Sequence, residues 1–98
     1  MTHKVVFRRQ ARAEFDAAAD WYEQERAGLS AEFHNAIDRV LERIASQPAQ
    51  FPKIQDDIRR AVDMRFPYCV YFRVRGQVAV VLAVLHSARN PAIWRGRE

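Results

Sequence analysis

Apolar and polar residues alternate along Tyr68–Arg75, and a nearly unbroken aliphatic run follows at Val78–Leu85. Both patterns are typical of β-strands, and the Gly76-Gln77 break between them predicts a β-hairpin. Loops of two and of three residues are both compatible with this break. A two-residue loop would place Phe72 opposite Val81, and a three-residue loop would shift that partner by one residue. The choice matters because a one-residue slip changes which side chains share a face.

The first strand of the predicted hairpin has two unlike faces. One face suits a hydrophobic core and carries Tyr68, Val70, Phe72 and Val74. The other face, which we expect to be an open aromatic and basic surface, carries Cys69, Tyr71, Arg73 and Arg75. The second strand has no polar side chain along its aliphatic run, so we expect it to be central in the sheet and covered on both faces.

Two amphipathic helices are predicted before the hairpin. The first spans residues 9–26, with an apolar stripe formed by Ala11, Phe15, Ala18 and Tyr22. The second carries the stripe Phe33, Ile37, Val40, Leu41 and Ile44. We expect Ser30 to be the N-cap of the second helix, which ends near Ser46 because Pro48 cannot continue it. A link this short predicts an antiparallel helical hairpin.

The remaining segments complete a single-domain prediction for residues 1–98. Residues 3–8 and 59–64 are expected to be strands, and residues 48–57 a loop. The predicted order is β-α-α-β-β-β, an α+β fold with the helical hairpin packed on one face of a small, mostly antiparallel sheet.

Composition restricts the function classes. No apolar run approaches the roughly 20 residues that span a bilayer, and no signal peptide is evident, so we expect a soluble, cytoplasmic protein. The single cysteine, Cys69, excludes an intrachain disulfide. The histidines show no metal-ligand spacing and there is no phosphate-binding loop, so we expect no metal and no cofactor.

Charge is distributed unevenly along the chain. Residues 1–50 carry seven basic and eight acidic side chains, whereas residues 51–98 carry nine basic and four acidic ones. The basic residues are nearly all arginine, which favours planar contacts with acidic partners. The candidate partners are nucleic acid and an acidic protein segment, and a solvated basic surface is the simpler alternative.

Three short motifs and their order carry a family resemblance. They are Trp21-Tyr22-Glu23 near the end of the first helix, Phe66-Pro67-Tyr68 at the entry to the hairpin, and His86-x-x-Arg89-x-Pro91-x-x-Trp94 after its last strand. Together with the order of elements they resemble the RelE/ParE superfamily of type II toxin–antitoxin toxins over essentially the whole chain. The tail pattern favours the ParE-like branch.

This resemblance implies a toxin that binds and inhibits DNA gyrase without being an enzyme. The expected target-binding residues are Arg89, Asn90, Pro91, Trp94 and Arg95. Trp94 has two interpretations: the side chain folds back to cover a sheet edge, or it is an exposed interface anchor, since Trp and Arg dominate binding hot spots.

The alternative within the superfamily is a ribosome-dependent mRNA endonuclease of the RelE type. A metal-free RNase needs an acid or base close to concentrated positive charge. The residues that could supply it are His86, Arg89, Arg65 and Arg73. Two departures from the RelE pattern weigh against this reading: Cys69 replaces an arginine, and there is no tyrosine after Tyr71.

The resemblance also implies a cognate antitoxin with a small, acidic carboxyl-terminal segment. We expect that segment to cover apolar surface on the helical hairpin and to offer carboxylates to the basic half of the chain. The expected antitoxin-binding residues are Phe15, Tyr22, Phe33, Ile37, Tyr71 and Arg73. A third possibility is an inactive toxin that persists as an antitoxin-binding module.

Overall fold

Within residues 2–89, which the computed structural model describes, the strands form one mixed sheet. The strands are β1 (Lys4–Phe7), β2 (Lys53–Gln55), β3 (Ile58–Asp63), β4 (Tyr68–Arg75) and β5 (Val78–His86). They lie in the order β1-β5-β4-β3-β2. β1 runs parallel to β5 and the other neighbours are antiparallel, which makes the sheet mostly antiparallel, as predicted.

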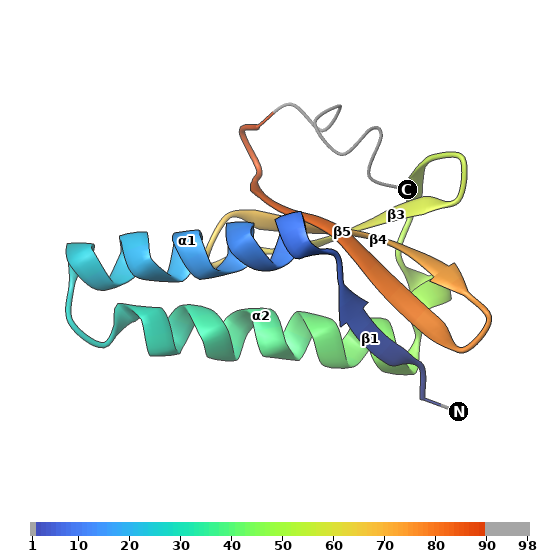
Figure 1. Ribbon diagram of the computed structural model, residues 1–98, viewed down its shortest axis with the longest axis horizontal. Helices are drawn as coiled ribbons and strands as arrows, with labels where there is room; N and C mark the ends of the chain where they lie inside the picture. The colour runs from blue at the N-terminus through green and yellow to red at the C-terminus, as the bar shows by residue number, and fades with distance from the viewer. Residues whose placement is uncertain (1, 90–98) are drawn as a thin grey trace.

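Helices α1 (Arg9–Glu25) and α2 (Leu29–Ser46) form an antiparallel hairpin, and a short 3-10 turn, η1 (Pro48–Gln50), follows. The two helices lie side by side in Figure 1, with the sheet beside them. Their apolar stripes pack on one face of the sheet, since Phe15, Phe33 and Ile37 share one buried cluster with Val70 and Phe72. The predicted α+β architecture is therefore confirmed. No helix in the described part of the chain combines the length and the hydropathy that a membrane span requires.

The predicted loop at residues 48–57 contains an additional strand. β2 pairs with β3 through Lys53–Arg59 and Gln55–Ile58, with an irregular register between the two pairs. The expected order β-α-α-β-β-β thus gains one short edge strand. A three-residue strand is too short to show alternation, and Asp56, with φ of 51°, reverses the chain directly after it.

The β4–β5 hairpin has the two-residue loop. Arg75 pairs with Val78 and Phe72 with Val81, and Gly76 adopts a φ of 60° in the turn. The register then shifts, because Tyr71 pairs with Ala83. Leu82 is therefore an extra residue in β5, a bulge that pattern alone does not reveal.

The second face of the sheet differs from the expected open surface. Tyr71 and Cys69 are 2% and 3% exposed, and they form a second apolar cluster with Ile58, Leu82 and Leu85. The expectation of an open aromatic and basic surface was wrong, because Tyr71 is buried within this apolar cluster and Arg73 is held by Asp57. The prediction that β5 is central and buried on both faces is confirmed.

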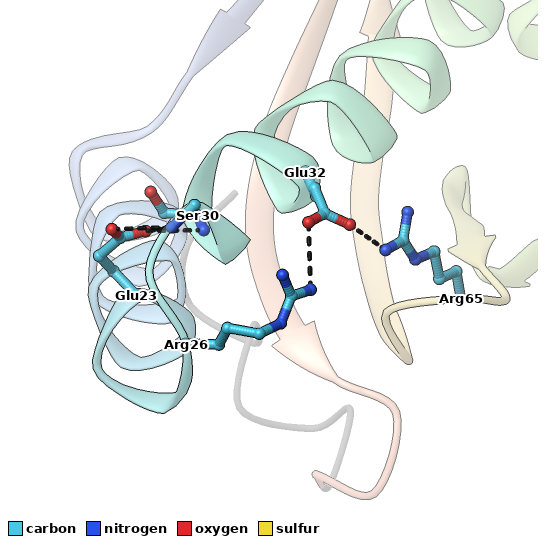
Figure 2. A network of polar contacts seen from close by, with 6 residues as sticks. Glu23, Arg26, Ser30, Glu32 and Arg65 are labelled. Carbon is cyan, nitrogen blue, oxygen red and sulfur yellow. Dashed lines mark hydrogen bonds and ion pairs between the residues drawn. The ribbon is translucent and has the colours of Figure 1, made fainter.

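The start of α2 also differs from the prediction. Gly28, with φ of 88°, precedes the first helical residue, and Ser30 lies inside the helix. The capping group comes instead from α1: the Glu23 carboxylate accepts the backbone N–H of Gly28 (3.0 Å) and of Ser30 (3.1 Å). Figure 2 shows this contact across the helical hairpin. These hydrogen bonds lower the pKa of Glu23.

Candidate functional site

The carboxyl end of β5 is held in place by hydrogen bonds on both sides of His86. The Ser87 N–H donates to the Pro67 carbonyl (2.7 Å), and the Arg89 N–H donates to the His86 carbonyl (2.9 Å). The His86 side chain contributes as well, since its Nδ1 accepts the Ala88 N–H at 3.0 Å. Arg89 therefore follows a tight, hydrogen-bonded turn at the end of a rigid strand.

A groove of about 570 Å³ lies between α1 and this end of the hairpin. Its lining residues come from α1, from β4 and β5, and from the turn: Glu14, Ala17, Ala18, Trp21, Tyr22, Tyr68, Val84, Leu85, His86 and Arg89. Trp21 is 55% exposed and stands at this groove, although its side chain is large and apolar. An exposed aromatic beside a groove is typical of a binding surface.

Aromatic packing fixes the wall of the groove. The Tyr68 ring lies 5.5 Å from the His86 ring, 6.1 Å from Tyr22 and 5.2 Å from Phe33, measured between centroids. Burial raises the pKa of Tyr68, and the positive charge of Arg89 opposes that rise. Tyr68 and Arg89 both line the groove.

A second hollow, of about 640 Å³, lies near the carboxyl end of α2 and is lined mostly by polar residues. His3 Nδ1 is buried there without a hydrogen-bond partner among the described residues. Among residues 2–89, none of the candidates that the sequence suggested lines this hollow.

Arg65, a candidate catalytic residue of the RNase interpretation, is held in an ion-pair network in the structure. It forms an ion pair with Glu32 of α2, which also pairs with Arg26 at 3.1 Å. Figure 2 shows Glu32 between the two guanidinium groups. Both hydrogen bonds lower the pKa of Glu32, with that from Arg65 acting most strongly. The network ties the tip of the helical hairpin to the β3–β4 turn.

Arg73, a second candidate catalytic residue, is ion-paired near the Gly76-Gln77 turn of the β4–β5 hairpin. Its Nη2 lies 2.5 Å from Asp57 Oδ1, and Arg75 Nη1 lies 2.5 Å from Asp57 Oδ2. These two arginines hold the pKa of Asp57 far below its usual range. Asp57 is therefore the anion that holds the two arginines at this end of the sheet.

The four candidate catalytic residues are not assembled into one centre. Tyr68 pairs with His86, whereas Arg73 pairs with Val80. Five residues along β4 separate the two pairs, a distance of about 17 Å at the usual rise per residue. His86 and Arg89 share the groove, while Arg65 and Arg73 are held elsewhere by carboxylates.

Comparison with protein-family models decides which family this is. The model described as the ParE toxin of the type II toxin–antitoxin system parDE matches residues 5–91. The chain belongs to this ParE toxin family. The match includes α1, α2, every strand of the sheet apart from Lys4 of β1, and the groove residues from Glu14 to Arg89.

A solved structure agrees with the fold of this ParE-family chain. A chain from the "Chromosomal ParDE TA system from P. aeruginosa" superposes with a TM-score of 0.75. The sequences are 20% identical, and the match covers 87% of this chain and 96% of the other. At this identity the likeness supports the fold alone. No curated protein sequence matches the chain.

The expected antitoxin-binding residues lie in different environments in this ParE-family chain. Phe15, Phe33, Ile37 and Tyr71 are each at most 2% exposed, so packing within the chain already covers them. Arg73 is held by Asp57. Tyr22 alone among the six lines the groove and is half-buried. Antitoxin binding by this set remains a prediction.

Sequence reasoning did not single out two groove residues. Glu14, which is not part of the predicted apolar stripe of the first helix, accepts the backbone N–H of Val84 through Oε1 at 3.0 Å. Trp21 was recognised only as part of a family motif. The feature that could have indicated an exposed Trp21 is its position beside the apolar stripe of α1, outside the surface that packs on the sheet.

Part of the expected target-binding set lies outside the described residues. Arg89 is exposed at the mouth of the groove, whereas Asn90, Pro91, Trp94 and Arg95 follow the described part of the chain. Within residues 2–89, no group of three or more His, Cys, Asp or Glu side chains is arranged to hold a metal ion.

Proposed function

We propose that this ParE-family toxin inhibits DNA gyrase by binding to it, and that a cognate antitoxin neutralises it. The observation that carries the proposal is the family match over residues 5–91. Gyrase is proposed as the target because the tail motif of this chain resembles that of ParE-like toxins, which poison gyrase. His86 and Arg73 lie at opposite ends of the β4–β5 pairing, so they do not form one catalytic centre. This separation supports inhibition by binding rather than by catalysis.

The basic end after β5 is the proposed contact with gyrase. Arg65 and Arg73 are each paired with a carboxylate, whereas Arg89 has no carboxylate partner among residues 2–89. An exposed arginine on a rigid strand end is well suited to an interface hot spot. Asn90, Pro91, Trp94 and Arg95 continue the same proposed surface in the sequence.

A supercoiling assay with purified gyrase tests this function. We expect the wild-type chain to inhibit supercoiling and to leave gyrase–DNA cleavage complexes. Arg89→Ala should weaken inhibition about tenfold, the effect of losing one interface anchor worth roughly 1.4 kcal/mol. Arg39→Ala removes the same charge from the exposed face of α2 and should inhibit like the wild type.

The assay also separates the alternatives. Wild-type chain that leaves supercoiling unchanged would contradict the gyrase proposal. Codon-periodic cuts in translated mRNA, detected by toeprinting and lost in His86→Ala, would indicate the RelE-type endonuclease. Harmless overexpression with intact antitoxin binding would indicate an inactive module.

The antitoxin is proposed to be a small protein with an acidic carboxyl-terminal segment. Carboxylates on that segment would complement the excess of arginine in residues 51–98. Co-expression with the product of the neighbouring reading frame should restore growth and yield a complex that co-purifies. Failure of that protein to bind would contradict the neutralisation part of the proposal.

A further inference from the structure

The hollow of about 640 Å³ at the carboxyl end of α2 is separate from the groove. Its lining includes Ser46, the last residue of α2, and Val74, near the end of β4. The groove is lined by Tyr68, at the start of β4. Tyr68 and Val74 are about 20 Å apart at the usual rise per residue of a strand, so the two cavities belong to opposite ends of the sheet.

Two cations of this hollow stand directly opposite each other in the sheet. Lys53 of β2 pairs with Arg59 of β3, and both residues line the hollow. Like charges at directly opposite positions of neighbouring strands destabilise a sheet. Neither side chain forms an ion pair with a carboxylate among residues 2–89, since Asp57 of the same lining binds Arg73 and Arg75 instead. An anion between Lys53 and Arg59 would therefore relieve their repulsion.

The guanidinium of Arg59 is held in place by the backbone. Its Nη1 donates to the Phe51 carbonyl at 2.6 Å and to the Ala49 carbonyl at 3.4 Å. Neutral carbonyls orient the group without balancing its charge. Within residues 2–89 its Nε and Nη2 form no hydrogen bond of their own, and these two nitrogens make the bidentate contact that arginine forms with an oxyanion.

His3 adds a third polar group to the hollow. Its backbone N–H donates to the Ala45 carbonyl at 2.8 Å, which fixes His3 against the end of α2. Its Nδ1 is buried and has no hydrogen-bond partner among the described residues. A buried polar nitrogen without a partner costs free energy, so a bound group that supplies one is favoured.

These groups select the class of ligand. Lys53 and Arg59 bring two positive charges, which match the charge of about −1.5 to −2 on a phosphate monoester at pH 7. A metal cation fits less well, because the one carboxylate among the described lining residues, that of Asp57, is bound by two arginines. Pro48 and Val74 supply apolar surface, and a hollow of this volume has room for an organic group beside the phosphate.

We propose that this hollow binds a small phosphate monoester. The phosphate lies between Lys53 and Arg59, where one of its oxygens meets His3 Nδ1, and the organic part packs on Val74. The site is distinct from the proposed contact with gyrase, and it holds whether or not the chain acts on gyrase.

NMR titration of the full chain tests the site, with inorganic phosphate and a panel of nucleoside monophosphates and sugar phosphates as probes. We expect the backbone amides of Lys53 and Arg59 and the ring nitrogens of His3 to shift, whereas the rings of His34 and His86 should not. At least one ester should bind about tenfold more tightly than inorganic phosphate, because its organic part adds apolar contact. Unshifted Lys53 and Arg59 amides, or no ester tighter than inorganic phosphate, would overturn the proposal.

Variants of the chain locate the phosphate. Lys53→Ala and Arg59→Ala should each weaken binding of the best ester at least about tenfold, the effect of losing one charge-assisted contact. Arg59→Ala also loses the hydrogen bonds to the loop, so the exposed Lys53 decides if that variant fails to fold. Lys4→Ala is the matched control, because Lys4 is exposed and shares a strand face with Val6, which packs in the cluster on the other side of the sheet. Equal weakening in Lys4→Ala would indicate general attraction to this basic end and would overturn the site.

Melting temperatures test the repulsion between the two cations. In phosphate-free buffer Lys53→Gln should melt at a higher temperature than the wild type, because the like-charge pair with Arg59 is removed. A saturating ester should raise the melting temperature of the wild type more than that of Lys53→Gln. A lower melting temperature for Lys53→Gln without phosphate would mean that Lys53 supports the fold, and would overturn the proposal.

The source of the phosphate is tested with a single-stranded oligonucleotide that has no terminal phosphate. We expect it to leave the Lys53 and Arg59 amides unshifted at concentrations where the best ester saturates them. An oligonucleotide that binds at these amides as tightly as the ester would assign the hollow to a nucleic-acid backbone and overturn the small ligand.

Discussion

The two ends of the β4–β5 hairpin are held by different forces. At the end with Tyr68 and His86, aromatic rings pack together: Phe33 lies 5.5 Å from Phe66 and 5.2 Å from Tyr68, and Tyr22 lies 5.0 Å from Phe66. At the Gly76-Gln77 turn, Asp57 pairs with two arginines of β4. One end is fixed by apolar burial and the other by charge.

This difference shows why nearby arginines do not form one positive surface. Arg73 and Arg75 share the single carboxylate of Asp57, which balances one of their two positive charges. Arg89 stands at the aromatic end, where no described carboxylate pairs with it. Arg89 therefore presents its charge where apolar packing provides a support beside an open groove.

Breaking the aromatic end should have the largest effect on stability. Phe33→Ala removes a fully buried ring that contacts Tyr22, Phe66 and Tyr68. We expect a loss of about 3–5 kcal/mol in the free energy of unfolding, through lost burial and a cavity. Urea denaturation followed by circular dichroism measures it. Trp21→Ala is the control, because this ring is 55% exposed and its loss should cost far less.

Breaking the charged end should cost less. Asp57→Asn removes the anion between Arg73 and Arg75, of which Arg73 has a side chain only 12% exposed. We expect a loss of about 1 kcal/mol, since the Asp57 and Arg75 side chains are largely solvated. Asp56→Asn is the matched control, because Asp56 forms none of the ion pairs found within residues 2–89. Equal losses in the two variants would show that the Asp57 pairs contribute nothing.

Acid should weaken the charged end through Asp57, in addition to the contacts of Glu23 and Glu32, whose pKa values are also lowered. The two arginines lower the pKa of Asp57 in the folded state, whereas the unfolded value is about 3.9. The stabilisation is thus present above about pH 4 and lost as the pH falls through the lower, folded pKa. Between about pH 5 and pH 3 the wild type should lose more stability than Asp57→Asn. Phe33→Leu, which keeps Asp57, should show the same pH dependence as the wild type.

The fold could be predicted largely from periodicity and turn residues. The two apolar stripes and the Gly76-Gln77 break were sufficient for the helical hairpin and for the β4–β5 hairpin, because these depend on local patterns. They left the register open between a two-residue and a three-residue loop, and the structure has the two-residue loop. β2 and the bulge at Leu82 were missed, since a three-residue strand and a single inserted residue leave no periodic signal. The cap of α2 was missed because Glu23 reaches it from another helix.

The candidate site was harder to predict because ion pairs depend on tertiary neighbours. Arg65, Arg73 and Arg89 are equivalent in a sequence, and only the fold shows that Arg65 pairs with Glu32 and Arg73 with Asp57. The contact between Glu14 and Val84 joins residues 70 positions apart, so no local pattern could indicate it. The position of His86 and Arg89 at a strand end, by contrast, follows directly from where the aliphatic run stops.

The smallest expected effect concerns the second ionic network, which joins the helical hairpin to the aromatic end. Glu32→Gln removes its ion pairs with Arg26 and Arg65, whose side chains are 59% and 58% exposed. Because exposed pairs are screened by water and salt, the melting temperature should fall less than in Asp57→Asn, and the difference should vanish in high salt. Asp38→Asn, on the exposed face of the same helix, controls for the change in charge. A larger fall than in Asp57→Asn would mean that the aromatic end also depends on charge, and the contrast between the two ends of the hairpin would fail.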